Sequence, residues 1–164
     1  MGDWPELLWL VLIDSVTWGA LHMGVAWGGT QLPAAWFSPR FPLFLPMGWE
    51  DHGRFYERVF RVRRWKRLLP DGSAWFRRGF RKGRLGASNS AYLEQFVRET
   101  CRGEAVHWVV MSCGWLFFAW NPPWLAWCMV AYALTANLPC IITQRYNRLR
   151  MTRVIRRGHP ASGQ

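Results

Sequence analysis

Glu104 and His107 are the residues whose types and spacing best suit catalysis. They stand three positions apart, so both side chains project from one face if the segment is helical. A carboxylate beside an imidazole holds the ring in one tautomer and raises its basicity, as a general base acting on a hydroxyl group requires. We therefore name both as candidate catalytic residues; the alternative is that they merely lie at the edge of a membrane.

His52 is a second candidate for the base. It follows Glu50 and Asp51 and precedes Glu57 by five positions, a spacing similar to the HxxxxD motif of glycerol-phosphate acyltransferases. Glutamate stands here in place of aspartate, and the later motifs of those enzymes are missing from the sequence. We therefore interpret the spacing as coincidental and keep His52 itself as the rival of His107.

Other kinds of catalytic site find little support in the sequence. It has no second ExxH motif for a di-iron site, no CxxC pair and no GxSxG nucleophile motif. We therefore expect no bound metal or cofactor and no acyl-enzyme intermediate. Asp14 and His22 interrupt the first apolar run of the chain, and we expect them to face the interior of a helix bundle or an interface rather than to act directly in catalysis.

Three apolar runs must position the candidate residues. They cover residues 5–27, 104–120 and 124–143, and a helix of about 20 apolar residues crosses a hydrocarbon core of about 30 Å. The second and third runs flank Asn121-Pro122-Pro123, so a helical hairpin would bring their polar outer ends to one membrane face. The sequence predicts an all-α integral membrane protein with three transmembrane helices, as a single domain over residues 1–164.

Shorter elements are expected around these runs. Four prolines in residues 28–49 rule out one long helix and predict short turns at the membrane interface. Apolar residues recur at helical spacing in Arg54–Leu69, which predicts an amphipathic cytoplasmic helix ending before Pro70-Asp71-Gly72. Ser88–Arg102 is predicted to form a helix that continues into the second span, and residues 151–164 to form a disordered basic tail.

Lysine and arginine are confined to two blocks, residues 40–102 and 145–157, which hold all 21 of them. This bias predicts a multi-pass protein of the plasma membrane with the basic segment 50–102 and the C-terminus in the cytoplasm. A net charge of +11 would also suit a nucleic-acid-binding protein. The long blocks without lysine or arginine favour anionic lipid headgroups instead, so we expect membrane lipids and no nucleic acid as partners, and leave the oligomeric state open.

Three blocks of sequence, in this order, resemble a known family. They are HGRFYERVFRVRRWKRLLPDG, ETCRGEAVHW and ANLPCIITQRYNRLR, and the likeness extends from about Leu32 to Arg157. They are similar to the small membrane acyltransferases typified by glycosyl-4,4'-diaponeurosporenoate acyltransferase, which acylate a glucosylated carotenoid acid in the last step of staphyloxanthin formation. The resemblance implies transfer of a fatty acyl group from acyl-CoA or another thioester to a sugar hydroxyl of a glycosylated lipid or carotenoid.

The resemblance also supplies candidate site residues. His107, oriented by Glu104, would deprotonate the sugar hydroxyl, with His52 as the alternative base. The polar positions that match the family's blocks are candidates for binding the substrate or the acyl donor: Lys66, Arg102, Asn137, Gln144, Arg145, Tyr146, Asn147 and Arg148. Among them, Arg145, Asn147 and Arg148 are expected to hold phosphate or thioester groups and to stabilise the oxyanion.

Two other functions remain open from the sequence alone. A non-catalytic membrane adaptor would use the basic segment for anionic lipids and would need neither Glu104 nor His107. A membrane methyltransferase or reductase would use a basic interfacial site for a nucleotide cofactor.

Overall fold

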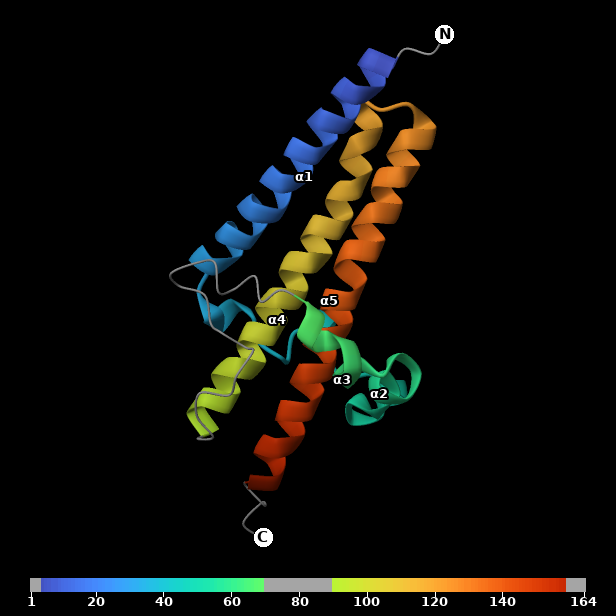
Figure 1. Cartoon of the computed structure of the whole chain (residues 1–164). Helices are drawn as coiled ribbons and strands as arrows, with labels where there is room; N and C mark the ends of the chain where they lie inside the picture. The colour runs from blue at the N-terminus through green and yellow to red at the C-terminus, as the bar shows by residue number, and fades with distance from the viewer. Residues whose placement is uncertain (1–3, 70–89, 159–164) are drawn as a thin grey trace.

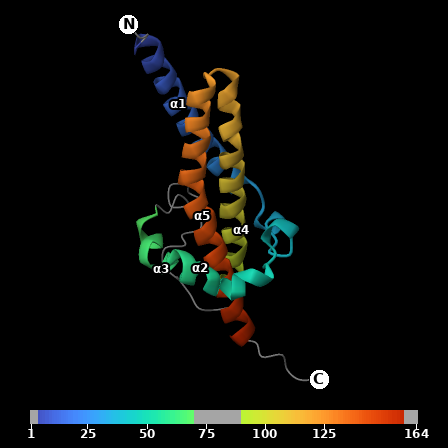
Figure 2. The same cartoon turned by 90° about the vertical axis from the view of Figure 1, so that its right-hand side faces the viewer.

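The computed structural model describes residues 4–69 and 90–158, and it is helical with no strand in these two ranges. Three long helices run side by side: α1 (Trp4–Gln31), α4 (Ser90–Ser112) and α5 (Pro123–Gly158) (Figures 1 and 2). The shorter elements are α2 (Arg54–Phe60), α3 (Val62–Trp65) and the 3-10 turns Ala34–Trp36, Pro42–Phe44, Gly48–Gly53, Lys66–Leu68 and Cys113–Ala119. The predicted all-α class is confirmed.

Within residues 4–69 and 90–158, two helices are long and apolar enough to cross a membrane, α1 and the Pro123–Arg157 part of α5. The predicted second span, residues 104–120, is not one of them. Its α-helix ends at Ser112 and continues as the 3-10 turn Cys113–Ala119, in which hydrogen bonds run from residue i to i+3 and the backbone winds more tightly. The structure therefore supports membrane association, while three transmembrane helices stay a prediction.

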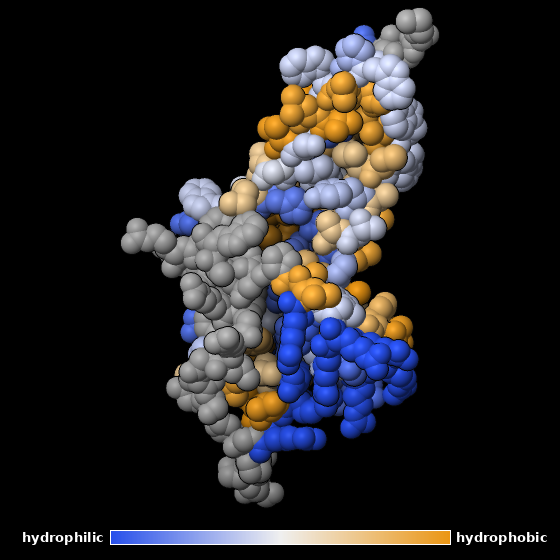
Figure 3. All heavy atoms as spheres, in the orientation of Figure 1, coloured by the Kyte–Doolittle hydropathy of each residue, from blue (hydrophilic) through white to orange (hydrophobic). Residues whose placement is uncertain are grey.

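Small residues bring the 3-10 turn Cys113–Ala119 and α5 close together. A Cβ atom on Gly114 would lie 3.0 Å from the Cβ of Ala133, so the hairpin is packed backbone to backbone at this level. Trp18 of α1 joins this contact, where it stacks on Phe117 with ring centroids 4.6 Å apart. Figure 3 shows apolar residues along the upper part of the molecule and hydrophilic residues gathered over α2, α3 and the lower part of α5.

The predicted amphipathic helix over residues 54–69 is wrong as a single element. Arg61 has φ 50° and ψ 44°, a left-handed conformation that costs a non-glycine residue about 1–2 kcal/mol and separates α2 from α3. The break turns Val62 inward, where its side chain is fully buried against Tyr146 and Leu149 of α5. Burial of one valine, worth about 1.5–3 kcal/mol, offsets that cost.

The basic tail also differs from the prediction. Residues 151–158 are helical rather than disordered, because α5 continues to Gly158. Met151 and Ile155, four positions apart on one face, pack on Leu93 and Phe96 of α4. Residues 159–164 lie outside the described part of the chain, as does the predicted Pro70-Asp71-Gly72 turn. Within the segment 28–49 that was predicted to form short turns, residues 33–49 do so, whereas residues 28–31 belong to α1.

Candidate active site

Glu104 is fully buried between α4 and α5. Its Oε1 accepts hydrogen bonds from Arg145 Nη1 at 3.0 Å and Trp108 Nε1 at 3.3 Å, and its Oε2 accepts one from Arg148 Nη1 at 2.5 Å. Within the described residues the carboxylate makes no hydrogen bond to His107. The structure therefore does not support the predicted orientation of His107 by Glu104, since the carboxylate is turned toward two arginines.

Arg145 links Glu104 to Glu50. Its Nε and Nη2 donate to the Glu50 carboxylate at 2.8 and 3.1 Å, and its two Nη nitrogens also donate to the carbonyls of Leu43 and Leu45 at 3.0 and 3.2 Å. With the bond to Glu104, these contacts engage all five N–H groups of a guanidinium. No N–H group of Arg145 is left for a phosphate or an oxyanion.

We call Glu50, Glu104, Arg145 and Arg148 the buried ion cluster. The two carboxylates balance the two guanidinium groups, and the exposed fraction of each residue is 8% or less. Removing one member would leave an uncompensated buried charge, which typically costs about 3–5 kcal/mol. The cluster therefore fastens the proline-rich segment before α2 onto α4 and α5.

Burial would raise the pKa of Glu50, but hydrogen bonds from Arg145, Met47 and Tyr56 outweigh it, and the pKa lies below its usual value of 4.5. The backbone N–H of Met47 donates to Oε2 at 2.6 Å and the Tyr56 hydroxyl to Oε1 at 2.5 Å. Burial and the bond to Glu50 raise the pKa of Tyr56. The hydroxyl of Tyr56 is therefore a fixed donor, and Glu50 is a charged carboxylate at neutral pH.

His107 is paired with Asn137 of α5. Its Nδ1 lies 3.0 Å from Asn137 Oδ1, and Asn137 Nδ2 donates to the carbonyl of Ala133 at 2.8 Å. A backbone carbonyl can only accept, so the amide nitrogen must face Ala133 and the amide oxygen must face the imidazole. Nδ1 of His107 therefore carries the proton, and a neutral ring then has its basic lone pair on Nε2.

Lys66, Asn147, Tyr146 and Arg63 form a second polar group, which we call the basic patch. Lys66 Nζ donates to Asn147 Oδ1 at 2.8 Å and lies 5.0 Å from the centre of the Tyr146 ring, while Arg63 Nε donates to the Tyr146 hydroxyl at 2.8 Å. Burial lowers the pKa of Lys66, and the nearby charges of Arg150, Arg63 and Arg67 lower it further. Such a surplus of positive charge suits an anionic ligand.

The remaining candidates are Arg102 and Gln144. Arg102 forms an ion pair with Glu99 at 3.0 Å, donates to the carbonyl of Leu32 at 3.0 Å and lies over the Phe37 ring, so it fastens the end of α1 to α4. Gln144 is half-buried on α5, directly before Arg145 in the chain.

His52 is exposed and occupies an unusual backbone turn. Asp51, His52 and Gly53 have φ values of 44°, 53° and 91°, and left-handed non-glycine residues of this kind are costly. Two contacts hold the turn: Arg153 Nη2 donates to the His52 carbonyl, and Gly53 lies against Leu149. Since Leu149 is twelve residues beyond Asn137, about 18 Å along the helix, His52 and His107 belong to different sites.

Sequence reasoning missed Tyr56, Arg63 and the partnership of Glu50 with Arg145. The usable signal was the spacing of Arg145 and Arg148 at i and i+3, which places both guanidinium groups on one face of the helix. If that face is buried, the two guanidinium groups need carboxylates from other parts of the chain. Asp14 does face inward as expected, because it is 2% exposed and accepts hydrogen bonds from Trp120 and Asn121.

Comparison with known proteins relates this arrangement to a family. Residues 33–157 match the family described as glycosyl-4,4'-diaponeurosporenoate acyltransferase. The protein of that name from Staphylococcus aureus strain bovine RF122 / ET3-1 is 34% identical over 120 residues, 73% of this chain and 72% of the relative. Its counterparts in strains USA300 and MRSA252 are 32% and 33% identical over the same shares. No solved structure matches the chain. This chain belongs to the glycosyl-4,4'-diaponeurosporenoate acyltransferase family and is an acyltransferase.

Proposed function

We propose that the protein transfers a fatty acyl group from an acyl thioester to a sugar hydroxyl of a glycosylated lipid or carotenoid, with His107 as the general base. The observation that carries this proposal is the His107–Asn137 pair, whose geometry protonates Nδ1 and leaves Nε2 basic. Membership in an acyltransferase family favours this function over an adaptor or a nucleotide-dependent enzyme. Glu104 has a structural part in this scheme and Asn137 takes over the orienting role.

The reaction needs one proton relay and no acyl-enzyme. Nε2 of His107 accepts the proton of the sugar hydroxyl while that oxygen attacks the thioester carbonyl. The tetrahedral intermediate then collapses, the carbon–sulfur bond breaks, and the thiolate takes the proton back from Nε2. The products are an ester and a thiol, and the imidazole returns to its starting form.

The donor side of the proposal rests on the basic patch. Phosphate groups of a thioester carrier, as in acyl-CoA, would bind near Lys66 and Asn147. Ten residues separate Asn147 from Asn137, which is about 15 Å along α5, and a pantetheine arm spans such a length. The thioester would then reach His107 while the phosphates stay on the basic patch.

The topology that fits this chemistry has three membrane passes. The apolar half of α5, the stretch 104–120 and α1 would lie in the plasma membrane, with the basic patch, α2, α3 and the C-terminus in the cytoplasm. The exposed apolar side chains of α1, among them Leu8, Trp9 and Val16, suit contact with lipid. Cytoplasmic acyl thioesters would then meet a membrane-borne acceptor at the level of His107.

Acylation in vitro tests the proposal directly. The purified protein in nanodiscs is incubated with palmitoyl-CoA and a glucosylated polyene acid, and the lipids are examined by mass spectrometry. We expect a new species heavier by one palmitoyl group with the wild type and about a hundredfold less of it, or lower still, with His107→Gln at equal protein amount. Equal product from both proteins would overturn the assignment of the base.

A further inference from the structure

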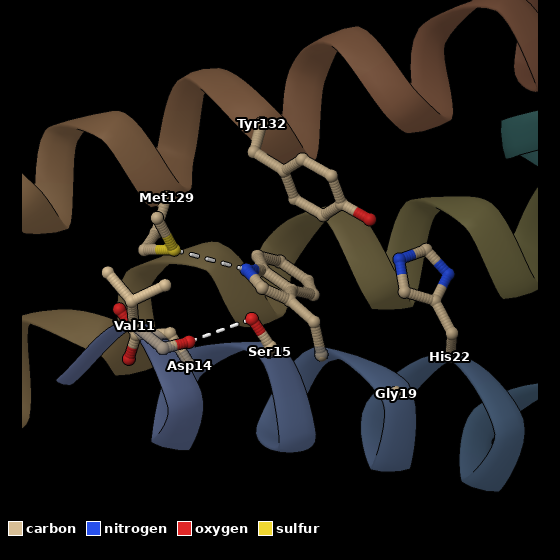
Figure 4. A pocket seen from close by; sticks show the side chains of 8 residues that line it. Val11, Asp14, Ser15, Gly19, His22, Met129 and Tyr132 are labelled. Carbon is tan, nitrogen blue, oxygen red and sulfur yellow. Dashed lines mark hydrogen bonds between the residues drawn. The ribbon is translucent and has the colours of Figure 1, made fainter. Parts of the chain in front are cut away.

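A groove of about 410 Å³ runs between α1 and α5, apart from the buried ion cluster and the basic patch, and its lining includes Asp14 and Ser15. Trp18, Met129 and Tyr132 supply much of its wall, and Gly19 leaves one part of it open (Figure 4). Trp18 is held in place by a hydrogen bond from its Nε1 to the sulfur of Met129 at 3.4 Å and by its stacking on Phe117. The groove is therefore a preformed, mostly apolar surface within the part of the molecule that suits a membrane.

Two polar side chains meet at one end of this groove. His22 Nε2 is buried and has no hydrogen-bond partner within the described residues, and the ring of Tyr132, an exposed residue that also lines the groove, lies 6.4 Å from the His22 ring. Figure 4 shows the His22 ring and the Tyr132 hydroxyl side by side at this end. An apolar groove with a few converging polar groups is the usual form of a ligand site, and a buried unpaired nitrogen costs about 1–3 kcal/mol until a ligand satisfies it.

The same end of the groove leads toward His107. Gly29, seven residues after His22, packs against Val106, which is adjacent to His107 in the chain. Asn137 follows Tyr132 by five residues on α5. The groove therefore ends about 8–10 Å, measured along the helices, from the His107–Asn137 pair, a distance that one sugar ring and its linkage can bridge.

We propose that this groove binds the hydrocarbon chain of the glycosylated acceptor, with its sugar at His107 and the carbonyl oxygen of its ester linkage hydrogen-bonded to His22 and Tyr132. This inference rests on the proposed function, because it takes the acceptor to be a glycosyl ester of a long-chain acid. It assigns acceptor recognition to α1, which lies outside the residues matched by the family.

The polar end of the groove distinguishes this occupant from others. The saturated chain of an acyl donor has no oxygen that could reach His22 once its thioester lies at His107. A phospholipid would place its oxygens at the membrane surface rather than between Trp18 and Tyr132. A flat conjugated chain also stacks well on these two aromatic side chains.

Filling the groove at Gly19 tests the proposal. A Cβ atom at Gly19 or at Gly24 meets nothing within 4 Å, but only Gly19 lines the groove. The probe is retinoyl β-glucoside, the glucosyl ester of a polyene acid, and its binding to protein in nanodiscs is followed by retained polyene absorbance. We expect Gly19→Leu to weaken binding about tenfold or more and Gly24→Leu to bind as the wild type does.

A second pair of variants tests the hydrogen bonds. Tyr132→Phe and His22→Phe are expected to weaken binding of retinoyl β-glucoside about three- to tenfold, and to leave binding of retinyl β-glucoside, which lacks the carbonyl, unchanged. Equal binding by Gly19→Leu and the wild type would overturn the groove assignment, as would a Gly19→Leu effect confined to the KM of palmitoyl-CoA. If the wild type binds the probe in the groove and never acylates it, the proposed function fails and the groove assignment stands.

Discussion

The amide oxygen of Asn137 lies 3.0 Å from Nδ1 of His107, and the amide nitrogen of the same side chain is tied to the carbonyl of Ala133 at 2.8 Å. The two bonds together give the imidazole a defined tautomer and a defined plane. Asn137 is fully buried and His107 is half-buried, so water competes little for the bond between them. A histidine held in this way is suited to repeated proton transfer at Nε2.

Asn137 should therefore act as a positioning residue for His107. We expect His107→Gln to lower kcat by about 10²–10⁴-fold, the usual contribution of a general base, and Asn137→Leu to lower kcat with little change in the KM of either substrate. Asn137→Asp keeps an acceptor at Nδ1 and should retain more activity than Asn137→Leu. Its added charge favours the imidazolium, so the rise of kcat/KM with pH should occur at higher pH than in the wild type.

The pH profile separates this role from a purely structural one. A loss of stability alone in Asn137→Asp would lower the amount of active protein without moving the pH profile. An unmoved profile, with activity equal to that of Asn137→Leu, would contradict the pairing that we describe.

Glu104 should matter for stability rather than for the base. Glu104→Gln leaves Arg145 and Arg148 without a full counter-charge in a buried place, and we expect a loss of about 3–5 kcal/mol in the free energy of unfolding. The double variant Glu104→Gln/Arg148→Met removes one charge of each sign and should recover much of that loss. Chemical unfolding in detergent measures both variants. Wild-type stability of Glu104→Gln together with a shifted pH profile of kcat would show instead that Glu104 acts on His107.

Much of the fold followed from the sequence because the apolar runs and the proline pair are strong local signals. The hairpin of α4 and α5, the presence of α1 and the short turns over residues 33–49 all depend on hydrophobicity and on proline, which act within a few residues. The helix α1 nevertheless extends to Gln31, beyond the predicted end at residue 27. The break at Arg61 did not follow, since it depends on the burial of Val62 against α5. The helical tail was missed because only the packing of Met151 and Ile155 on α4 makes it stable.

The sequence predicted which residues belong to the candidate site, but it did not predict which of them form hydrogen bonds with one another. Residue spacing placed Glu104 beside His107, since they share one helix face. Which of the two meets an arginine, and which meets an asparagine, is decided by the register between α4 and α5 and by the distant Glu50. A pattern within one helix carries no information on that register.

Glu50 should make the stability of the protein dependent on pH in the acid range. Its pKa in the folded protein lies below the usual value of 4.5, so its contribution to stability is fully present above that value. The contribution is lost as the pH falls through the lowered pKa. We expect Glu50→Gln to be less stable than the wild type at neutral pH and to lose less stability on acidification, as measured by unfolding between neutral and acid pH.

Tyr56→Phe is the matched variant for this measurement. It keeps the ring and removes the hydroxyl that donates to Glu50 at 2.5 Å. The loss of that bond should raise the pKa of Glu50, so acid destabilisation should begin at higher pH than in the wild type. If the free energy of unfolding falls at the same acid pH in Tyr56→Phe and in the wild type, the hydroxyl does not help to keep Glu50 charged.

Lys66 should control the affinity for a phosphate-bearing donor. Burial and the charges of Arg150, Arg63 and Arg67 hold its pKa below the usual 10.5, so Lys66 loses its proton at lower pH than an ordinary lysine. The KM of palmitoyl-CoA should therefore rise as the pH increases through this lowered pKa. Lys66→Arg should abolish the dependence because a guanidinium stays charged, and Lys66→Met should raise the KM about tenfold or more at neutral pH, as expected for a hydrogen bond to a charged group.

Two controls make the Lys66 result specific. Arg64→Met removes an equal charge from an exposed position on α3, two residues before Lys66, and should leave the KM close to that of the wild type. A palmitoyl thioester of N-acetylcysteamine carries no phosphate, so its KM should be the same with Lys66→Met and with the wild type. If Lys66→Met impairs both thioesters equally, or if Arg64→Met matches it, then the basic patch does not recognise phosphate and the donor must bind elsewhere.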